Sequence, residues 1–318
     1  MSGKEDWHDK DDGGRTRARF DFVMETISTN DKTRTAYLSI KPDPRRYSEI
    51  MVEGKPHYLD NFLKNVIPVE EVQRMAAEHL RGLPVHYKPP TIGSARKYAG
   101  ARRNALDAEL AGAGYEPPKE KAAPHTPIVA SDVPSYLSFI SVDLCGSTSL
   151  RRKDAKRFEE AYEIFLRELA TVVGQFHGSI LKTTGDGFIA YIDYPAYTTQ
   201  CDNTIDLGLT ILTVLRDSVN PALSEVGLPE LHVRIGADYG AATIRSVMIA
   251  TTGFATSEVS SDALNRSVKI EQSCARDEFR IGRALYELIH TQWLVRCTEA
   301  EFDGSEVGIE NYQIYIVR

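Results

Sequence analysis

Cysteine is scarce in this chain, and the cysteines that occur form no pattern. There are four in 318 residues, they are widely separated, and none belongs to a C-x-x-C pair. A disulfide scaffold and a cysteine zinc framework are therefore excluded, and a reducing compartment is favoured. The eight histidines show no H-x-x-x-H or H-E-x-x-H spacing, which argues against a catalytic zinc site.

Long apolar runs, an export signal and a phosphate-binding P-loop are also missing. No run of about 18 apolar residues occurs, so no transmembrane helix is predicted. The N-terminus is charged and lacks the apolar core of a signal peptide. No G-x-x-x-x-G-K-[ST] motif is present, and the net charge of -7 argues against a nucleic-acid binder. We therefore expect a cytoplasmic protein with neither a membrane nor a nucleic acid as its partner.

The chain divides into three regions by composition. Residues 1–19 are polar and charged, which predicts a disordered tail. Residues 20–130 mix strand-like and helical runs and end in a Pro-rich, charged stretch, so they are predicted to form an N-terminal accessory region and linker. Residues 131–318 have the clearest hydrophobic pattern and are predicted to form the main domain.

The main domain begins with a regular alternation of strands and helices. A short apolar run ends at Leu144, and an amphipathic helix follows it. Two strand-like runs are then separated only by Gly185 and Asp186, which predicts a tight hairpin. After a second helix, residues 231–249 are predicted to form two strands that turn near Tyr239 and Gly240. The order β-α-β-β-α-β is typical of a ferredoxin-like α+β fold.

Two aspartates should meet at one end of that sheet. Asp143 is at the end of the first strand, and Asp186 is in the hairpin turn. A helix connects the first and second strands, so these strands run parallel and both aspartates lie at the same end. Adjacent carboxylates repel each other unless a cation lies between them, and Mg²⁺ commonly takes one or two carboxylates together with phosphate oxygens. Each aspartate alone is more often a cap or turn residue, but the joint placement favours a metal site.

The loop after Asp143 is small and polar. It contains Gly146, Ser147 and Thr148 and leads into a helix. Its backbone N–H groups are predicted to bind the triphosphate of a nucleotide.

Five motifs in the main domain resemble those of class III nucleotide cyclases, in the same order. FISVDLCGSTSL and LKTTGDGFIAYI resemble the two metal-binding motifs of the family. RIGADYG resembles its RIGxHxG strand, ALNRSVKIEQSC resembles its VNxAxRLE helix, and FRIGRALYELI resembles the segment that follows. The resemblance covers residues 136–297 and implies a cyclase catalytic domain within 131–318.

The resemblance also implies a role for individual residues. Asp143 and Asp186, with the backbone carbonyl of Leu144, would hold two Mg²⁺ or Mn²⁺ ions per active site. Asn265 would orient the ribose in the transition state. Lys269 stands where the family usually has arginine, and it would supply positive charge to the triphosphate. Family members act as dimers with the site at the interface, so a homodimer is implied.

Substrate choice is the point at which this chain departs from the purine cyclases. By the same resemblance, Lys182 stands where the family places a base-selecting residue and Glu258 lies near the other such position, but Ser261 replaces the usual glycine. With its divergent base pocket, the chain resembles the bacterial pyrimidine cyclases of Pycsar anti-phage systems. That likeness implies UTP, with CTP as the other pyrimidine, conversion to cyclic UMP or cyclic CMP, and a separate effector that responds to the product. An adenylate or guanylate cyclase remains one alternative, and a non-catalytic nucleotide-binding regulatory domain is the other.

The accessory region contains basic and aromatic residues whose role stays open. Arg45, Arg46, Tyr47, Tyr58 and Tyr87 are candidates to cover a nucleotide base or to sense a phage signal. The alternative, that they are ordinary core and surface residues, is favoured.

Overall fold

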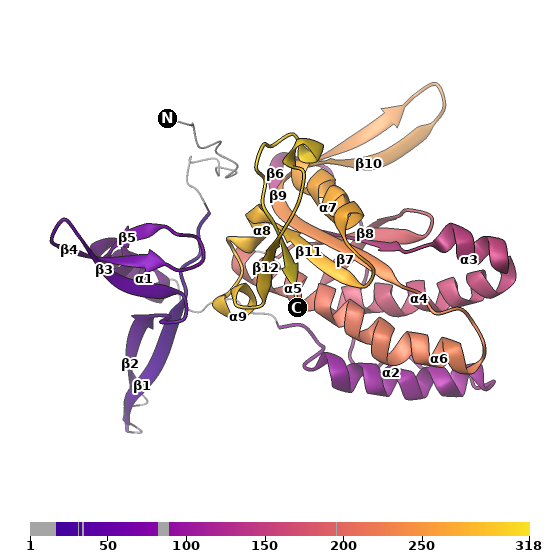
Figure 1. Cartoon of the computed structure of the whole chain (residues 1–318), viewed down its shortest axis with the longest axis horizontal. Coiled ribbons are helices and arrows are strands. Elements are labelled where there is room, and N and C mark those ends of the chain that lie inside the picture. The colour runs from indigo at the N-terminus through magenta and orange to yellow at the C-terminus, as the bar shows by residue number, and fades with distance from the viewer. Residues whose placement is uncertain (1–16, 31, 34, 82–88, 195) are drawn as a thin grey trace.

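The computed structural model describes residues 17–30, 32–33, 35–81, 89–194 and 196–318 (Figure 1). A small N-terminal module precedes a larger domain built on one mixed sheet. The elements of the module are β1 (Phe22–Asn30), β2 (Thr35–Pro42), β3 (Tyr47–Val52), β4 (Lys55–Asp60), β5 (Val66–Pro68) and α1 (Val69–Arg81). The elements of the larger domain are α2 (Ala95–Leu110), β6 (Ser131–Leu144), α3 (Ser147–Lys153), α4 (Ala155–Gln175), β7 (Gly178–Thr183), β8 (Gly187–Ile192), α5 (Tyr197–Val214), the π-helix η1 (Leu215–Val219), α6 (Asn220–Glu225), β9 (Val233–Ile249), β10 (Phe254–Ser260), α7 (Asp262–Ser273), β11 (Glu278–Gly282), α8 (Arg283–Tyr286), α9 (Thr291–Leu294), β12 (Cys297–Ala300), the 3₁₀-helix η2 (Gly304–Val307) and β13 (Ile314–Val317).

The large sheet confirms the predicted α+β fold. Its strands run in the order β12-β13-β11-β9-β6-β8-β7, and β10 pairs with β9 outside this path. β6 is antiparallel to both β8 and β9, and β7 is antiparallel to β8. β6 and β7 are therefore parallel without being neighbours, as the ferredoxin-like order requires. β11, β12 and β13 extend this arrangement on the β9 side.

The two faces of the sheet are covered differently. Along β6, Ile140 and Val142 pack into the main core with α4 and α5, whereas Leu137 and Phe139 pack toward α7. These helices lie on the two sides of the sheet (Figure 1). Because successive side chains of a strand alternate between faces, Asp143 lies on the α7 side. Among the helices of the described ranges, none combines the length and the apolar character that crossing a membrane requires.

Helix α2 belongs to the larger domain by its packing. Tyr98 and Leu106 are buried in the same core as α4 and α5. Arg102 forms two hydrogen bonds with the buried Glu168 of α4, at 2.8 and 2.9 Å. The predicted accessory region of residues 20–130 therefore contains a helix that completes the core of the domain that follows it.

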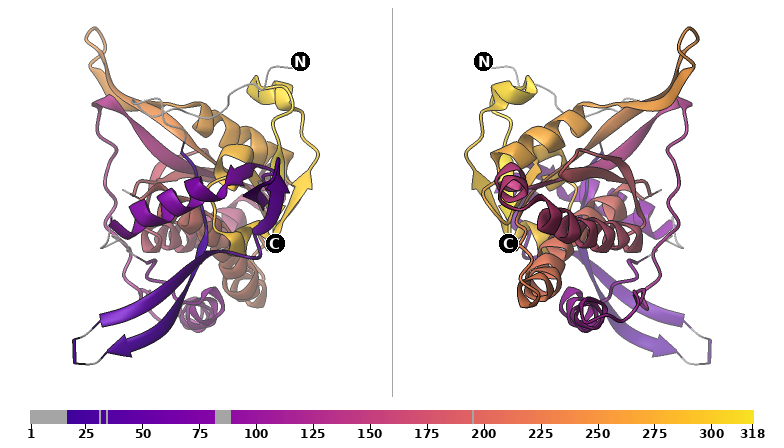
Figure 2. Two further views of the ribbon diagram at one scale, coloured as in Figure 1. Left: turned by 90° about the vertical axis from the view of Figure 1, so that its left-hand side faces the viewer. Right: turned by 90° about the vertical axis from the view of Figure 1, so that its right-hand side faces the viewer.

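Residues 233–249 form one long strand, not the two strands predicted. The Tyr239–Gly240 pair, taken for a turn, lies inside β9, where Gly240 pairs with Leu137 of β6. Pairing along β6 keeps this stretch extended, and a tertiary contact of this kind overrides a local turn signal. The far end of β9 turns back only after Ile249 to form the hairpin with β10, which projects from the domain (Figure 2).

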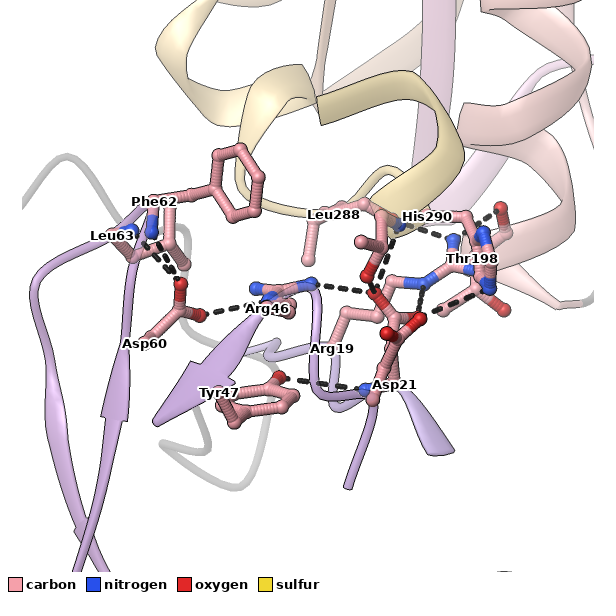
Figure 3. A network of polar contacts seen from close by, with 12 residues as sticks. Arg19, Asp21, Arg46, Tyr47, Asp60, Phe62, Leu63, Thr198, Leu288 and His290 are labelled. Carbon is pink, nitrogen blue, oxygen red and sulfur yellow. Dashed lines mark hydrogen bonds and ion pairs between the residues drawn. The ribbon is translucent and has the colours of Figure 1, made fainter. Parts of the chain in front are cut away.

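A buried charge network joins the N-terminal module to the larger domain (Figure 3). Asp21 accepts hydrogen bonds from Arg46 at 2.9 Å, from Arg19 at 2.8 Å, and from the hydroxyl and backbone N–H of Thr291. Arg46 is fully buried and also donates to Asp60 at 2.8 Å. The module is thus held by ion pairs and hydrogen bonds that are largely buried away from water.

Of the predicted disordered tail over residues 1–19, residues 1–16 lie outside the described part, and the last three residues contact the larger domain. The guanidinium of Arg17 lies 3.2 Å from the centre of the Tyr136 ring. Arg19 reaches Asp202 of α5 at 2.9 Å. This segment therefore crosses the larger domain in contact with it.

The structure separates the basic and aromatic residues of the module. Arg46 and Tyr47 are buried at the junction, and Arg45 is paired with Asp43 at 2.6 Å. Tyr58 is half-buried on β4. Tyr87 lies outside the described residues. For Arg46 and Tyr47, the ordinary reading as core residues is therefore confirmed.

Candidate active site

Strand register brings the two predicted aspartates together. Asp143 of β6 pairs with Gly187, the residue that directly follows Asp186. Gly185 has φ +97°, a conformation that makes the tight turn possible. A Cβ atom at Gly187 would lie 2.1 Å from the Val142 carbonyl oxygen, so only glycine allows this close approach of the strands. The G-D-G sequence thus presents the Asp186 side chain beside Asp143.

The pair is short of positive charge. Burial and the charge of Asp186 raise the pKa of Asp143, although Arg234 donates to it at 2.6 Å and acts in the opposite direction. The same Arg234 forms an ion pair with Glu271 of α7 at 3.0 Å, but without the alignment of a hydrogen bond. Burial raises the pKa of Glu271 to about 7. One arginine is therefore shared among neighbouring carboxylates, an arrangement that favours binding of a further cation.

The loop after β6 is built around the same pair. Gly146 has φ +71° and directly precedes α3 as its N-cap, and the Ser147 hydroxyl donates a hydrogen bond to Asp186. Cys145 N–H donates to the carbonyl of His232, the residue before β9, at 2.8 Å and fixes the loop there. Leu144 is buried at the strand end, and Thr148 is exposed. Ser147 therefore holds a carboxylate in this structure, while phosphate binding by the loop stays a prediction.

The donor set at this end of the sheet fits a divalent cation completed by substrate. Within the described ranges, no group of three or more His, Cys, Asp or Glu side chains is arranged to hold a metal ion. Mg²⁺ typically takes one or two protein carboxylates and fills its other positions with phosphate oxygens and water. Asp143 and Asp186 supply those two carboxylates, and their mutual repulsion is the feature that a cation would relieve.

A separate pocket contains the other predicted residues. It has a volume of about 590 Å³, and its lining includes Lys182 of β7 together with Asn265 and Lys269 of α7. Residues four apart share a face of a helix, so Asn265 and Lys269 both point to this cavity. Neither aspartate of the pair is among the lining residues. One chain therefore presents two half-sites, one with carboxylates and one with cationic and amide groups.

Glu258 lies apart from both half-sites. It is exposed on β10, opposite Arg245 of β9, and does not line the pocket. Asp262, at the start of α7, does line the pocket with Lys182. Glu258 was chosen by its spacing from Asn265 in the sequence. Asp262 lies three residues before Asn265 on α7, so the two side chains share one face of the helix.

The sequence reasoning also missed two residues beside the aspartate pair, Arg234 and Glu271. Both occur inside motifs that the sequence analysis quotes. The period of two along a strand and of 3.6 along a helix was therefore a signal that could have placed them on the Asp143 side.

Comparisons with solved structures show that the larger domain has a known fold. The guanylyl cyclase Cya2 superimposes with a TM-score of 0.51 at 18% identity, over 58% of this chain and 92% of that one. The adenylyl cyclase CyaB from P. aeruginosa gives 0.51 at 17% identity, over 58% and 95%. A bacterial light-regulated adenylyl cyclase gives 0.50 at 14% identity, over 61% and 55%. No protein-family model and no curated protein matches the chain. The domain has the fold of a class III cyclase catalytic domain.

Proposed function

We propose that the chain is a nucleotide cyclase that converts a nucleoside triphosphate to a 3′,5′-cyclic nucleotide and pyrophosphate. The observation that supports this most is the pairing of Asp143 with Asp186 by strand register, beside one shared arginine. The fold supports it too, because the similar structures are described as guanylyl and adenylyl cyclases.

Asp143 and Asp186, with the Leu144 carbonyl, would hold two Mg²⁺ or Mn²⁺ ions. Such ions lower the pKa of the ribose 3′-hydroxyl and stabilise the departing pyrophosphate. The 3′-oxygen forms a bond to the α-phosphorus, the bond from that phosphorus to the bridging oxygen of the β-phosphate breaks, and the hydroxyl proton passes to solvent. No protein side chain needs to be a strong base, because positioning and electrostatics carry most of the effect.

The residues of the pocket act on the rest of the substrate. Asn265 holds the ribose so that its 3′-oxygen is in line with the α-phosphorus. Lys269 offsets the negative charge of the triphosphate, which Gly146, Ser147 and Thr148 contact through the loop. Lys182 donates a hydrogen bond to the base, and its acidic counterpart is Glu258 by sequence or Asp262 by its position in the pocket.

The active enzyme is a homodimer with two equivalent sites at the interface. Support comes from the separation of the half-sites, because the lining of the pocket in one chain lacks the aspartate pair. In a two-fold dimer, the aspartates of one protomer can face the pocket of its partner, and the reverse.

The substrate is a pyrimidine nucleotide, with UTP favoured over CTP, and the product activates a separate effector in anti-phage defence within the cytoplasm. The support is the departure from the purine pattern at Ser261, Glu258 and Lys269. A purine cyclase fits the fold equally well, since the structural neighbours are described as adenylyl and guanylyl cyclases.

A panel of the four nucleoside triphosphates, each with Mn²⁺ or Mg²⁺, tests the proposal. We expect cyclic UMP as the main product, with pyrophosphate in equal amount. Cyclic AMP or cyclic GMP as the main product would overturn the pyrimidine assignment but not the cyclase. Nucleotide binding without any cyclic product would instead support the non-catalytic regulatory domain.

A further inference from the structure

A cluster of buried polar side chains lies between α7 and the sheet. Its centre is Asp238 of β9, which has no exposed surface. Its carboxylate accepts hydrogen bonds from Arg266 Nε, from the Tyr312 hydroxyl at 2.7 Å, and from the backbone N–H groups of Tyr239 and Leu285 at 2.9 and 3.3 Å. The buried charge is therefore fully partnered, as the cost of burying a carboxylate requires.

Arg266 is the member of the cluster that α7 contributes. Its side chain is 9% exposed, and its Nη2 atom also donates to the Tyr239 carbonyl at 3.2 Å. Two contacts to neighbouring points on β9 fix both the position and the direction of a planar guanidinium. A Cβ atom at Gly282 would lie 2.6 Å from Asp238 Cγ, so glycine on β11 leaves the space that the carboxylate fills.

Helix α7 has little freedom to shift on the sheet. A Cβ atom at Gly236 of β9 would lie 2.2 Å from the Glu271 nitrogen and 2.3 Å from the Ser267 carbonyl oxygen, so the two backbones touch. At the start of the helix, the Ser261 hydroxyl donates to the Ala241 carbonyl at 2.7 Å. Close contact sets the depth of α7, and the side chain of Arg266 sets its rotation.

That rotation decides where the pocket residues point. Arg266 and Ile270 are buried on the sheet side, where Arg266 also reaches the edge of the pocket, and each follows directly after Asn265 or Lys269. Since consecutive residues differ by about 100° around a helix, turning α7 to expose Arg266 would move Asn265 out of the pocket. The cyclase pattern RIGxHxG has histidine where this chain has Asp238.

We propose that Asp238, Arg266 and Tyr312 are positioning residues that hold α7 in the rotation at which Asn265 and Lys269 face the substrate. The proposal rests on the proposed cyclase function for its activity readout. It adds three residues outside the metal and base positions, which act on the reaction through Asn265.

Tyr312→Phe tests the cluster with the least disturbance, because it removes one hydroxyl and keeps the ring. Tyr315→Phe is the matched control, since that tyrosine is also buried but its hydroxyl bonds Arg283 at 2.8 Å, away from Asp238. In Tyr312→Phe we expect kcat to fall about tenfold, with KM for the preferred triphosphate changed less than about twofold. Both constants should stay within about twofold of wild type in the control. Hydrogen exchange of the α7 amides should rise in Tyr312→Phe alone.

Arg266→Ala gives a second arm with a chemical rescue. We expect kcat to fall about 100-fold. Added guanidinium ion should raise the kcat of the variant about tenfold, because the 9% exposed side chain borders the pocket. Methylammonium, which lacks the planar fork, should not restore activity.

Two results would overturn the proposal. One is a Tyr312→Phe enzyme whose kcat and α7 exchange match those of Tyr315→Phe. The other is rescue of Arg266→Ala by methylammonium as well as by guanidinium. If the wild-type chain cyclises no triphosphate, the proposed function fails, but the exchange measurement still decides whether the cluster holds α7.

Discussion

Two carboxylate clusters in this chain have opposite electrostatic balance. At the junction of the N-terminal module, burial raises the pKa of Asp21, but the charge of Arg19 and a hydrogen bond from Thr291 outweigh it, and the pKa is about 2. At the end of β6, burial and Asp186 raise the pKa of Asp143 despite Arg234. Asp21 therefore has two arginines beside it, Arg19 and Arg46, whereas Asp143 has one arginine that it shares with Glu271.

This difference separates a site with a structural role from the one that we propose to be functional. A carboxylate surrounded by arginines in a fixed network stabilises the fold and has no capacity for a further cation. A carboxylate pair with one shared arginine has that capacity, and perturbed groups of this kind collect at functional sites. The contrast predicts that damage to the junction costs stability, whereas damage at the end of β6 costs activity.

Removal of one carboxylate from the under-neutralised pair should have the largest effect. We expect Asp186→Ala to lower cyclic nucleotide formation at least about 10³-fold, because a divalent cation loses one of its two protein carboxylates. The melting temperature should not fall, since a like charge beside Asp143 is removed. Asp132→Ala, at the exposed far end of β6, is the control and should keep activity. Equal losses in both variants would contradict the assignment.

Breaking the charge network at the junction should instead destabilise the protein. Arg46→Met removes the buried arginine that pairs with both Asp21 and Asp60, so we expect a loss of about 3–5 kcal/mol in the free energy of unfolding. Arg45→Met is a matched control one residue earlier, with a side chain 54% exposed and paired to Asp43. It should cost less than about 1 kcal/mol. Denaturant unfolding measures both, and similar values for the two variants would refute the contrast.

The pH dependence of stability should show the same contrast. The pKa of Asp21 is lowered from 3.8 to about 2 in the folded protein, so its ionised form contributes about 2 kcal/mol of stability. Because the folded pKa is the lower one, this contribution is complete above pH 4 and is lost as the pH falls toward 2. The difference in unfolding free energy between wild type and Asp21→Asn should shrink over that range. A difference that stays constant with pH would count against the ionic role of Asp21.

Binding of a divalent cation should give the smallest effect, at the other cluster. At tenfold excess over its dissociation constant, Mn²⁺ should stabilise wild type by about 1.4 kcal/mol and raise the melting temperature by a few degrees. Asp186→Asn should show no such rise, because it lacks the second charge. A shift of the same size in both proteins would place the cation elsewhere.

The two carboxylate clusters differ in how well they could be predicted from the sequence. The carboxylate pair was predictable, because a strand end and a G-D-G turn are local signals and the crossover rule brings them together. The junction was not, because Asp21, Arg46 and Thr291 are far apart in the chain and only the folded chain joins them. The turn expected at Tyr239 and Gly240 failed for the same reason, since pairing with β6 keeps that stretch extended.

Within the candidate site, side-chain packing limited the prediction. Lys182, Asn265 and Lys269 line one cavity as their motifs implied, but Glu258 does not, and Asp262 stands in the pocket instead. Spacing from Asn265 fixes a position along the chain, whereas the direction of a side chain depends on where α7 begins and how it rests on the sheet. The cluster around Asp238 shows how much of that direction comes from contacts distant in sequence.

Mixing two inactive variants tests most directly whether the aspartate pair of one chain works with the pocket of another. Asp186→Ala lacks one half-site and Asn265→Ala lacks the other, so each homodimer should be inactive. In an equal mixture, about half of the dimers are heterodimers with one intact site of two, so we expect about a quarter of wild-type activity. A mixture that forms heterodimers yet stays as inactive as either parent would contradict the account.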